Sequence, residues 1–170
     1  PYYITSPILM RLLEERLPVE SITAMVQKEA ADRIAAAPGS RESGAISLAV
    51  RYYAEPKTLF TVSPGSSTPP PKVTSAIEQL TGISNAMVRS APPVAPRDER
   101  LLFAVIRAAF GQRRKTAVNA VSAGLKLPKE TVDAAVCALG RGALVRPEQL
   151  TLAEFAALAD RLAAAGVAAG

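Results

Sequence analysis

The sequence contains no histidine, no tryptophan and a single cysteine, Cys137. The imidazole and thiolate groups that most often bind transition metals are therefore almost absent, so no metal site is expected, and a histidine-based catalytic triad is excluded. One cysteine cannot form an internal disulfide, and its place in an alanine-rich helical run predicts a packing residue without a redox role.

Long apolar runs are also missing. Residues 8–13 form an apolar stretch that is interrupted by Arg11 and followed by Glu14 and Glu15, whereas a membrane span needs about 18 or more apolar residues in a row. The first residues lack the basic start and the small-residue cleavage site of a secretory signal. These absences predict a cytoplasmic protein with no membrane-embedded role.

The net charge of +5 is distributed unevenly along the chain. Residues 1–96 hold nine basic and eight acidic residues, whereas residues 97–170 hold eleven basic and seven acidic ones. No acidic residue lies between Arg100 and Lys129, and that segment contains seven basic residues: Arg100, Arg107, Arg113, Arg114, Lys115, Lys126 and Lys129. Such a segment predicts binding to a polyanion such as RNA.

The hydrophobic periodicity predicts an α/β portion followed by a helical one. Helices are expected over residues 8–17, 28–37 and 44–53, and short strands over residues 21–27, 58–62 and 73–80. A Gly/Ser/Pro loop without a helix joins the last two strands, so they are expected to pair antiparallel. A strand such as 22–27 is expected to need neighbours on both sides, and an open sheet edge invites aggregation, so a segment upstream is expected to be missing.

A second region is expected to be helical throughout. Residues 82–97 are rich in proline and serine and predict a linker. Beyond it, apolar stripes predict helices over residues 98–110, 113–123, 129–139 and 152–165. The predicted fold class is therefore α/β plus α, with an α/β part over residues 1–81 and a helical domain over residues 98–170.

Five segments together carry a family resemblance. They read M-V-Q-K-E-A-A-D-R-I (25–34), S-G-A-I-S-L-A-V-R-Y-Y (43–53), T-P-P-P-K-V-T-S-A (68–76), A-F-G-Q-R-R-K-T (109–116) and R-P-E-Q-L-T-L-A-E-F (146–155). With these segments, the chain resembles the KsgA family, also called RsmA, of ribosomal RNA small-subunit adenine dimethyltransferases from residue 1 to about residue 162. The triple proline followed by Lys72 is shared with the erythromycin-resistance methyltransferases, so it indicates only the superfamily. The last two segments favour the KsgA branch.

The resemblance implies an activity and a partner. It implies S-adenosylmethionine-dependent N6,N6-dimethylation of two adjacent adenosines near the 3′ end of 16S rRNA, with the pre-30S subunit as partner and a monomeric enzyme. It also implies that residues 1–81 are the C-terminal part of a Rossmann-like methyltransferase domain, followed by a helical RNA-binding domain over residues 98–170. Two alternatives stay open, namely an erythromycin-resistance-type 23S rRNA methyltransferase and a non-catalytic RNA-binding fragment.

The first residues resemble the end of the N-[L/I]-P-[Y/F] motif of amino-methyltransferases. By that resemblance the Pro1 carbonyl accepts a hydrogen bond from the adenine amino group, Tyr2 stacks on the flipped base, and Tyr3 contacts RNA. The alternative is a simple proline-aromatic turn. The glycine-rich loop and the acidic residue that hold S-adenosylmethionine have no counterpart here, so no cofactor-binding residue is expected and the chain alone is expected to be inactive.

Further candidate RNA contacts lie downstream. Lys72, in the proline loop, is expected to touch the RNA backbone unless it is a simple loop cation. Arg113, Arg114 and Lys115 follow a helix break at Gly111 and are expected to reach phosphates, against the alternative of a solvated helix surface.

Two further features concern packing and base capture. Tyr52 and Tyr53 are expected to serve core and sheet-edge packing, against the alternative of base stacking. Ser67 stands where the family usually carries a phenylalanine that closes the adenine pocket, and a lost base-stacking contact costs about 1–3 kcal/mol. Base capture is therefore expected to be weaker at this position.

Overall fold

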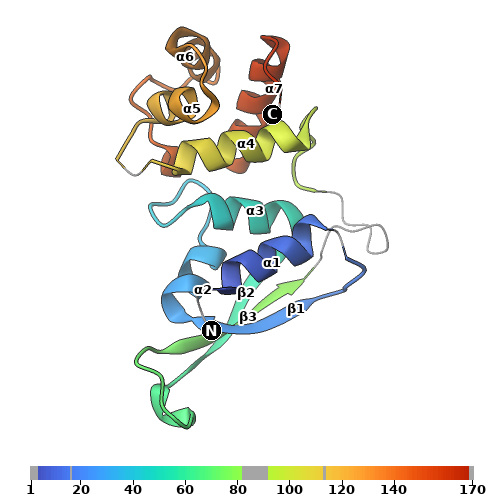
Figure 1. Cartoon of the computed structure of the whole chain (residues 1–170), viewed down its shortest axis with the longest axis vertical. Helices are drawn as coiled ribbons and strands as arrows, with labels where there is room; N and C mark the ends of the chain where they lie inside the picture. The colour runs from blue at the N-terminus through green and yellow to red at the C-terminus, as the bar shows by residue number, and fades with distance from the viewer. Residues whose placement is uncertain (1–3, 16, 82–91, 113, 169–170) are drawn as a thin grey trace. The chain divides into compact units, whose positions relative to one another are not determined.

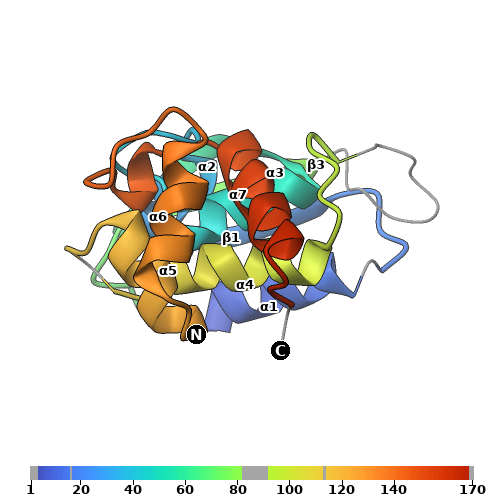
Figure 2. The same cartoon turned by 90° about the horizontal axis from the view of Figure 1, so that it is seen from above.

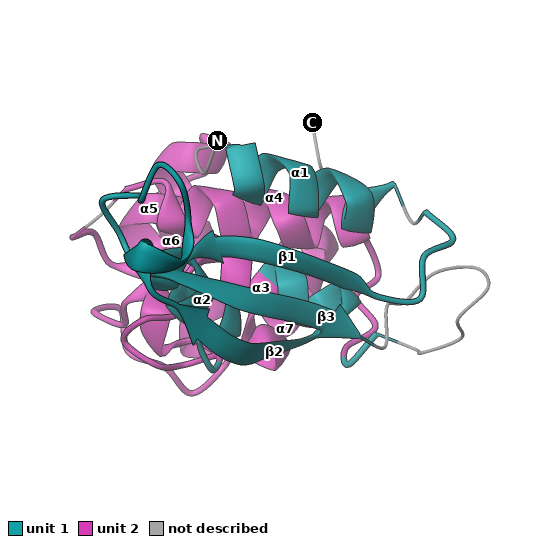
Figure 3. Cartoon of the chain, turned by 90° about the horizontal axis from the view of Figure 1, so that it is seen from below, with its two compact units in different colours: residues 1–37, 49–93 teal, residues 38–48, 94–170 magenta. Residues whose placement is uncertain are grey.

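The computed structural model describes residues 4–15, 17–81, 92–112 and 114–168. The chain divides into two compact units. Unit 1 comprises residues 1–37 and 49–93, and unit 2 comprises residues 38–48 and 94–170 (Figure 3). The segment 38–48 therefore groups with the C-terminal helices, although it lies between elements of unit 1 in the sequence.

Unit 1 is built around a three-stranded antiparallel sheet (Figure 1). The sheet order is β1-β3-β2, so the last strand in the sequence is the central one. The elements in chain order are α1 (Thr5–Glu14), β1 (Ile22–Gln27), α2 (Lys28–Ala35), β2 (Glu55–Val62), the short 3-10 helix η2 (Pro64–Ser66) and β3 (Ser75–Thr81). Helix α3 (Ala45–Tyr53) crosses the boundary between the two units.

Helix α2 covers one face of the sheet and contacts all three strands. Val26 of β1, Ala76 of β3 and Ala31 of α2 are fully buried together, with Ala24 and Ala30 packed against them. Small side chains on both sides of this contact let the helix approach the strands closely. The C-terminal end of α2 is capped by Arg51 of α3, whose guanidinium donates hydrogen bonds to the carbonyls of Ala35 (2.8 Å) and Ala36 (3.1 Å).

The regular elements of unit 2 in the described residues 94–112 and 114–168 are helical. They are α4 (Glu99–Phe110), α5 (Ala117–Leu125), α6 (Lys129–Cys137), the 3-10 helix η3 (Pro147–Gln149) and α7 (Leu152–Ala164). Helix α4 packs against α5 and α7, and α6 packs against α5 and α7 (Figures 1 and 2). The core contains Leu102, Ile106 and Phe155, which are fully buried.

Capping side chains set where these helices begin. Asp98 accepts a hydrogen bond from the Leu101 N–H (3.1 Å) at the start of α4, and Thr116 accepts one from the Asn119 N–H (3.3 Å) at the start of α5. At the start of α7, Thr151 and Glu154 form a reciprocal capping box. Each cap satisfies a backbone donor that the helix itself leaves without a partner.

Most of the predicted elements are confirmed, including the antiparallel pairing of the two later strands. The helix predicted over residues 113–123 is wrong at its start. Arg114 has a φ of 74°, which is not helical, and the Thr116 cap sets the first helical residue at Ala117. Strand β2 also begins earlier than predicted and includes Pro56. It is an edge strand, where the missing N–H of proline breaks no ladder.

The expectation that Cys137 is a packing residue is wrong, because its side chain is exposed. Val132, Ala135 and Val136 provide the buried face of α6, and Cys137 falls one position beyond it. Tyr52 and Tyr53 are confirmed as packing residues. Both are buried, and their rings meet edge to face with centroids 5.0 Å apart. Within the described part of the chain, no helix is long and apolar enough to cross a membrane.

Candidate nucleic-acid interface

Exposed cations without an acidic partner gather on unit 2. Six of the seven basic residues of the acid-free segment are described, and every one of them is exposed. None forms an ion pair with another described residue. They are Arg100, Arg107, Arg114, Lys115, Lys126 and Lys129. We call them the unpaired cations, and their charge is available to an external anion.

Other basic residues of the same unit are satisfied internally. Arg141 donates a hydrogen bond from Nε to Oε1 of Glu154 at 2.6 Å, and this contact holds the pKa of the Glu154 carboxyl below its usual range. Arg146 lies 3.9 Å from Glu148. Arg141 and Arg146 thus have acidic partners within the chain, whereas the unpaired cations have none among the described residues.

Helix α4 presents two of the unpaired cations on one face. Arg100 and Arg107 are seven residues apart, which is two helical turns, so their side chains leave the same side of the helix. Beside Arg107 lies a cavity of about 420 Å³ between α4 and the C-terminal part of α5. Arg107 and Gln112 provide its polar side chains, and Gly124 and Leu125 of α5 form the opposite wall.

A glycine makes the close approach of α4 and α5 possible. A Cβ atom on Gly124 would lie 2.6 Å from the Cβ and 3.0 Å from the Cα of Ala108. Any larger residue at position 124 would therefore force the two helices apart. Two positions after Gly124, the C-cap residue Lys126 adopts a φ of 54°, a left-handed conformation that ends α5.

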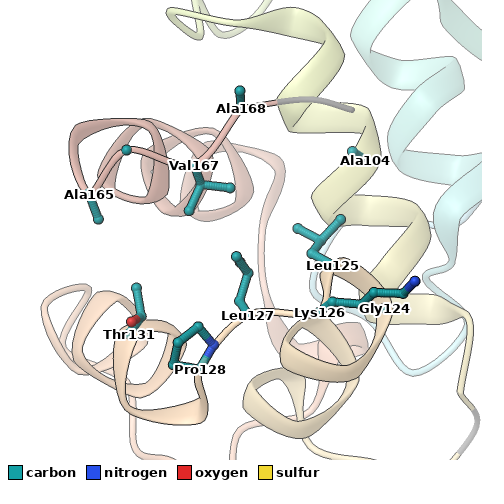
Figure 4. A pocket seen from close by; sticks show the side chains of 11 residues that line it. Ala104, Gly124, Leu125, Lys126, Leu127, Pro128, Thr131, Ala165, Val167 and Ala168 are labelled. Atoms are coloured by element: carbon teal, nitrogen blue, oxygen red, sulfur yellow. The ribbon is translucent and has the colours of Figure 1, made fainter.

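A second cavity, of about 740 Å³, adjoins the first. The two share Ala104, Gly124 and Leu125. Leu125, Leu127 and Val167 line it with apolar side chains, and Lys126 stands at its wall (Figure 4). This second hollow is therefore mainly apolar, with Lys126 as the one cation in its lining.

The residues that the sequence predicted fall into three groups. Arg114 and Lys115 lie in the loop between α4 and α5, where the Lys115 N–H donates to the Gln112 carbonyl at 3.4 Å. Lys72 is exposed in the loop before β3, in unit 1. Pro1, Tyr2, Tyr3 and Arg113 lie outside the described residues, so their predicted roles stay predictions.

Ser67 follows η2 and is half-buried, and its N–H donates to the Pro64 carbonyl at 3.3 Å. A serine side chain has no aromatic ring that could stack on a base. The predicted loss of a stacking contact at this position stays a prediction.

Unit 1 contains a buried carboxylate that the sequence analysis missed. Glu78 of β3 is 1% exposed, and its Oε2 accepts a hydrogen bond from the Thr58 hydroxyl at 2.7 Å. Oε1 has no hydrogen-bond partner. Burial raises the pKa of the Glu78 carboxyl, and the nearby Asp32 charge raises it further, whereas Thr58 and Arg51 oppose the shift. Glu78 alternates with the buried apolar residues Ala76 and Leu80 along β3, and this alternation was the available signal.

The groove residues of unit 2 were missed for a different reason. Gly124 and Leu125 carry no charge pattern, and only the crossing of α4 and α5 makes them neighbours of Arg107. Among the described residues, no group of three or more Cys, Asp or Glu side chains is arranged to hold a metal ion.

Comparison with known proteins identifies similar sequences. The family model described as "Ribosomal RNA adenine dimethylase" matches residues 1–162. A "Ribosomal RNA small subunit methyltransferase A" of Lachnoclostridium phytofermentans is 49% identical over 162 residues, which is 94% of this chain and 54% of that protein. The protein of the same name from Alkaliphilus oremlandii is 44% identical over 96% of this chain and 55% of its own length. The chain thus spans about half the length of the curated relatives it matches.

Two solved structures resemble the fold. A dimethyladenosine transferase from Plasmodium falciparum matches with a TM-score of 0.76 at 22% identity, covering 100% of this chain and 66% of that one. The 23S rRNA methyltransferase ErmE matches with a TM-score of 0.64 at 22% identity, covering 96% of this chain and 62% of that one. At this identity the likeness concerns the fold alone.

Proposed function

The chain belongs to the ribosomal RNA adenine dimethylase family, and we propose that it is the carboxyl-terminal part of an S-adenosylmethionine-dependent RNA methyltransferase. Its reaction is the N6,N6-dimethylation of two adjacent adenosines near the 3′ end of 16S rRNA in the pre-30S subunit. The observation that carries this proposal is the 49% identity with a relative named as a small-subunit ribosomal RNA methyltransferase. Such a substrate places the protein in the cytoplasm of a bacterial cell.

The two compact units support a division of labour. In this proposal residues 1–81 are the C-terminal part of a Rossmann-like catalytic domain, residues 82–97 are a linker, and residues 98–170 are an RNA-binding domain. The mixed α/β character of unit 1 and the unpaired cations of unit 2 support that assignment. The segment 38–48, which groups with unit 2, is an addition to the second domain that the sequence did not suggest.

The chemistry requires that the adenine amino group be held and exposed. Its nitrogen is a poor nucleophile because the lone pair is delocalised into the ring, so hydrogen-bond acceptors and a stacking face must position it. In this proposal the Pro1 carbonyl accepts from the amino group and Tyr2 provides the stacking face, while Tyr3 contacts RNA. Lys72 is proposed to touch the RNA backbone.

S-adenosylmethionine would supply the methyl group when bound. The sequence contains no G-x-G-x-G loop, and the described residues of this chain are therefore assigned no part in holding the cofactor. It follows that the chain alone transfers no methyl group in this proposal.

The unpaired cations are proposed to bind phosphates of the RNA. Arg100 and Arg107 would follow the backbone along α4, with Arg114 and Lys115 extending the contact into the next loop. Arg113 is proposed to join them. Each phosphate contact releases a counterion, so the affinity is expected to fall steeply with salt.

Titration of labelled RNA with the chain tests this interface. The probe is a fragment from the 3′ end of small-subunit rRNA, measured by fluorescence anisotropy at several salt concentrations. Arg107→Gln is expected to lower the salt slope by about 1. Arg161→Gln is the matched control, because it removes an exposed arginine of the same unit that lies outside the acid-free segment. Equal slopes for both variants would contradict the interface.

Two comparisons separate the alternatives. A tighter interaction with large-subunit rRNA of equal length would favour the erythromycin-resistance-type reaction. Fused behind the remaining half of the Lachnoclostridium relative, the chain is expected to transfer labelled methyl groups to small-subunit particles. Salt-dependent binding without any transfer by the fused protein would favour a non-catalytic RNA-binding function. Sedimentation of the fused protein with RNA is expected to show a monomeric enzyme.

A further inference from the structure

Two adjoining cavities of unit 2 make up one groove. The smaller, of about 420 Å³, lies beside Arg107, and the larger, of about 740 Å³, lies beside Lys126. Ala104, Gly124 and Leu125 line both of them. Gly124 and Lys126 are exposed, so the groove is open to solvent and is not an enclosed pocket. We call it the α4–α5 groove.

Helix α4 provides one side of the α4–α5 groove. Ala104 and Ala108 of α4 and its C-cap Gly111 line the smaller cavity at positions i, i+4 and i+7, so they lie on one helical face. Seven residues of an α-helix rise about 10 Å, which is two turns. None of the three has a side chain larger than a methyl group, so the backbone of a bound helix would have room to approach α4 along this stretch.

The lining is aliphatic and carries charge of one sign. Leu127 and Val167 extend into the larger cavity from opposite sides (Figure 4), and Leu125 lies beside them. Arg107 and Lys126 are the charged residues of the lining, and both belong to the unpaired cations. Among the described residues, neither cavity is lined by an acidic or an aromatic side chain.

This composition favours one class of ligand. A nucleobase would find no ring on which to stack, although stacking supplies much of the binding energy of single-stranded nucleic acid. A small molecule would stay largely exposed in an open groove, whereas ligand pockets bury most of their ligand. An amphipathic helix, by contrast, inserts apolar side chains at i, i+3, i+4 and i+7 into a groove and keeps its polar residues at the rim.

We propose that the α4–α5 groove binds an amphipathic helix of another polypeptide, with aliphatic residues on the inserted face and Asp or Glu residues beside that face. The aliphatic residues contact Leu125, Leu127 and Val167, and the carboxylates pair with Arg107 and Lys126. Charge complementarity selects an acidic partner, because a basic helix would meet two cations and no carboxylate in this lining.

The inference goes beyond the proposed methyltransferase function and does not rest on it. Arg107 is also one of the residues proposed to bind RNA phosphates, so the helix and RNA are expected to compete for the chain. An acidic helix in the α4–α5 groove would thereby lower the affinity of unit 2 for RNA.

Selection from a library of displayed helical peptides tests the proposal with the whole chain. Peptides that bind the immobilised chain are enriched over those that bind the empty support. The expected peptides place Leu, Ile, Met or Phe at i, i+3 or i+4, and i+7, with Asp or Glu on either side. Enrichment of basic peptides, of uniformly polar peptides or of none would overturn the proposal.

A substitution in the larger cavity shows whether the enriched peptides use this groove. Val167 lies beyond the end of α7 at Ala164, so Val167→Asp changes the lining outside a helix. It is expected to weaken an enriched peptide by about tenfold or more, because it puts a carboxylate against aliphatic side chains and other carboxylates. Leu144→Asp is the control, since Leu144 is 83% exposed, lies in unit 2 and lines neither cavity.

Fluorescence anisotropy of the labelled peptides measures both affinities. Equal weakening by the two variants, or by neither, would overturn the proposal. Thermal melts of both variants must match the parent chain, so that a loss of binding reports the groove and not unfolding.

Two cations with left-handed backbones test the charge complementarity. Lys126 and Arg114 have φ values of 54° and 74°, so glycine at either position keeps the backbone conformation. Lys126→Gly is expected to weaken an enriched peptide by about two- to fivefold, as the loss of an exposed ion pair does. Arg114→Gly removes the same charge outside the lining, where salt screens it from the peptide. An equal loss for both variants would show that the peptide responds only to net charge and would overturn the proposal.

Two further outcomes would assign the groove to another occupant. If Val167→Asp weakens binding of the RNA probe but of no enriched peptide, the groove binds RNA. If sedimentation shows self-association of the chain that Val167→Asp abolishes, the groove binds a second copy. Either outcome would overturn the proposal, and neither would contradict the proposed methyltransferase function.

Discussion

Unit 1 and unit 2 differ in what they leave exposed. Unit 2 buries Phe155 and most of its other large apolar side chains, leaves Leu144 exposed, and carries the unpaired cations on its surface. Unit 1 also buries large side chains, such as Ile34 and Leu80, but exposes Met25 and Phe60. The exposed surface of the helical unit is therefore cationic, whereas that of the sheet unit includes large apolar side chains.

The same substitution in both units tests this difference most strongly. Phe155→Ala removes a fully buried ring that lies 5.9 Å from the ring of Phe110, and it is expected to lower the free energy of unfolding by about 3–5 kcal/mol. Phe60→Ala removes an exposed ring and is expected to change it by no more than about 0.5 kcal/mol. Urea denaturation followed by circular dichroism measures both, and similar losses would show that the Phe60 ring is not exposed.

Gly124 tests how tightly the helical unit is packed. Gly124→Ala would place a methyl group 2.6 Å from the Cβ of Ala108, so we expect a loss of about 1–3 kcal/mol in the free energy of unfolding. Gly142→Ala is the control in the same unit, because nothing lies within 4 Å of a Cβ there. Thermal melts of both variants check the prediction, and a more stable Gly124→Ala variant would contradict the close crossing of α4 and α5.

The pH dependence of the free energy of unfolding tests whether the Glu78 carboxyl is buried in the sheet unit. Its pKa in the folded chain is raised above the ordinary value of 4.5, so protonation favours the folded state. The stabilisation is complete below the unfolded pKa and is lost as the pH rises through the raised one. Glu78→Gln keeps a group that can accept from Thr58, and is expected to gain stability on the order of 1 kcal/mol relative to the parent at pH 8.

The gain should shrink towards pH 4, where the parent carboxyl is protonated. Melting temperatures of the parent and the variant across this range measure it. Glu42→Gln, an exposed position, controls for the general effect of removing an acidic residue. A gain for Glu78→Gln that does not depend on pH would contradict the burial of this carboxylate.

The smallest expected effect concerns Cys137 on the surface of unit 2. Its exposed thiol should react with a disulfide reagent in the native state at a rate close to that of the unfolded chain. Cys137→Ser should leave the melting temperature unchanged within error, because no core contact is lost. If the Cys137 thiol reacted much more slowly in the native state, the residue would be buried and would have the packing role that the sequence predicted.

The sequence predicted those parts of the molecule that depend on local pattern. Apolar spacing located α4 and α7, and Asp98 and Thr151 stand at the caps where those helices begin. The acid-free run from Arg100 to Lys129 and the family segments were also visible without any structure. These features could be predicted because helix periodicity, capping and charge density are set by residues close together in the chain.

The tertiary structure decided which of these residues face solvent and which meet each other. Arg114 has a left-handed backbone conformation, so Arg114 and Lys115 lie outside a helix, and Cys137 lies outside the buried face of α6. The order β1-β3-β2 brought Met25, Ile77 and Phe60 into one row from three separate segments. No local pattern encodes such a row, because exposure depends on what packs against the opposite face and on strands that are distant in sequence.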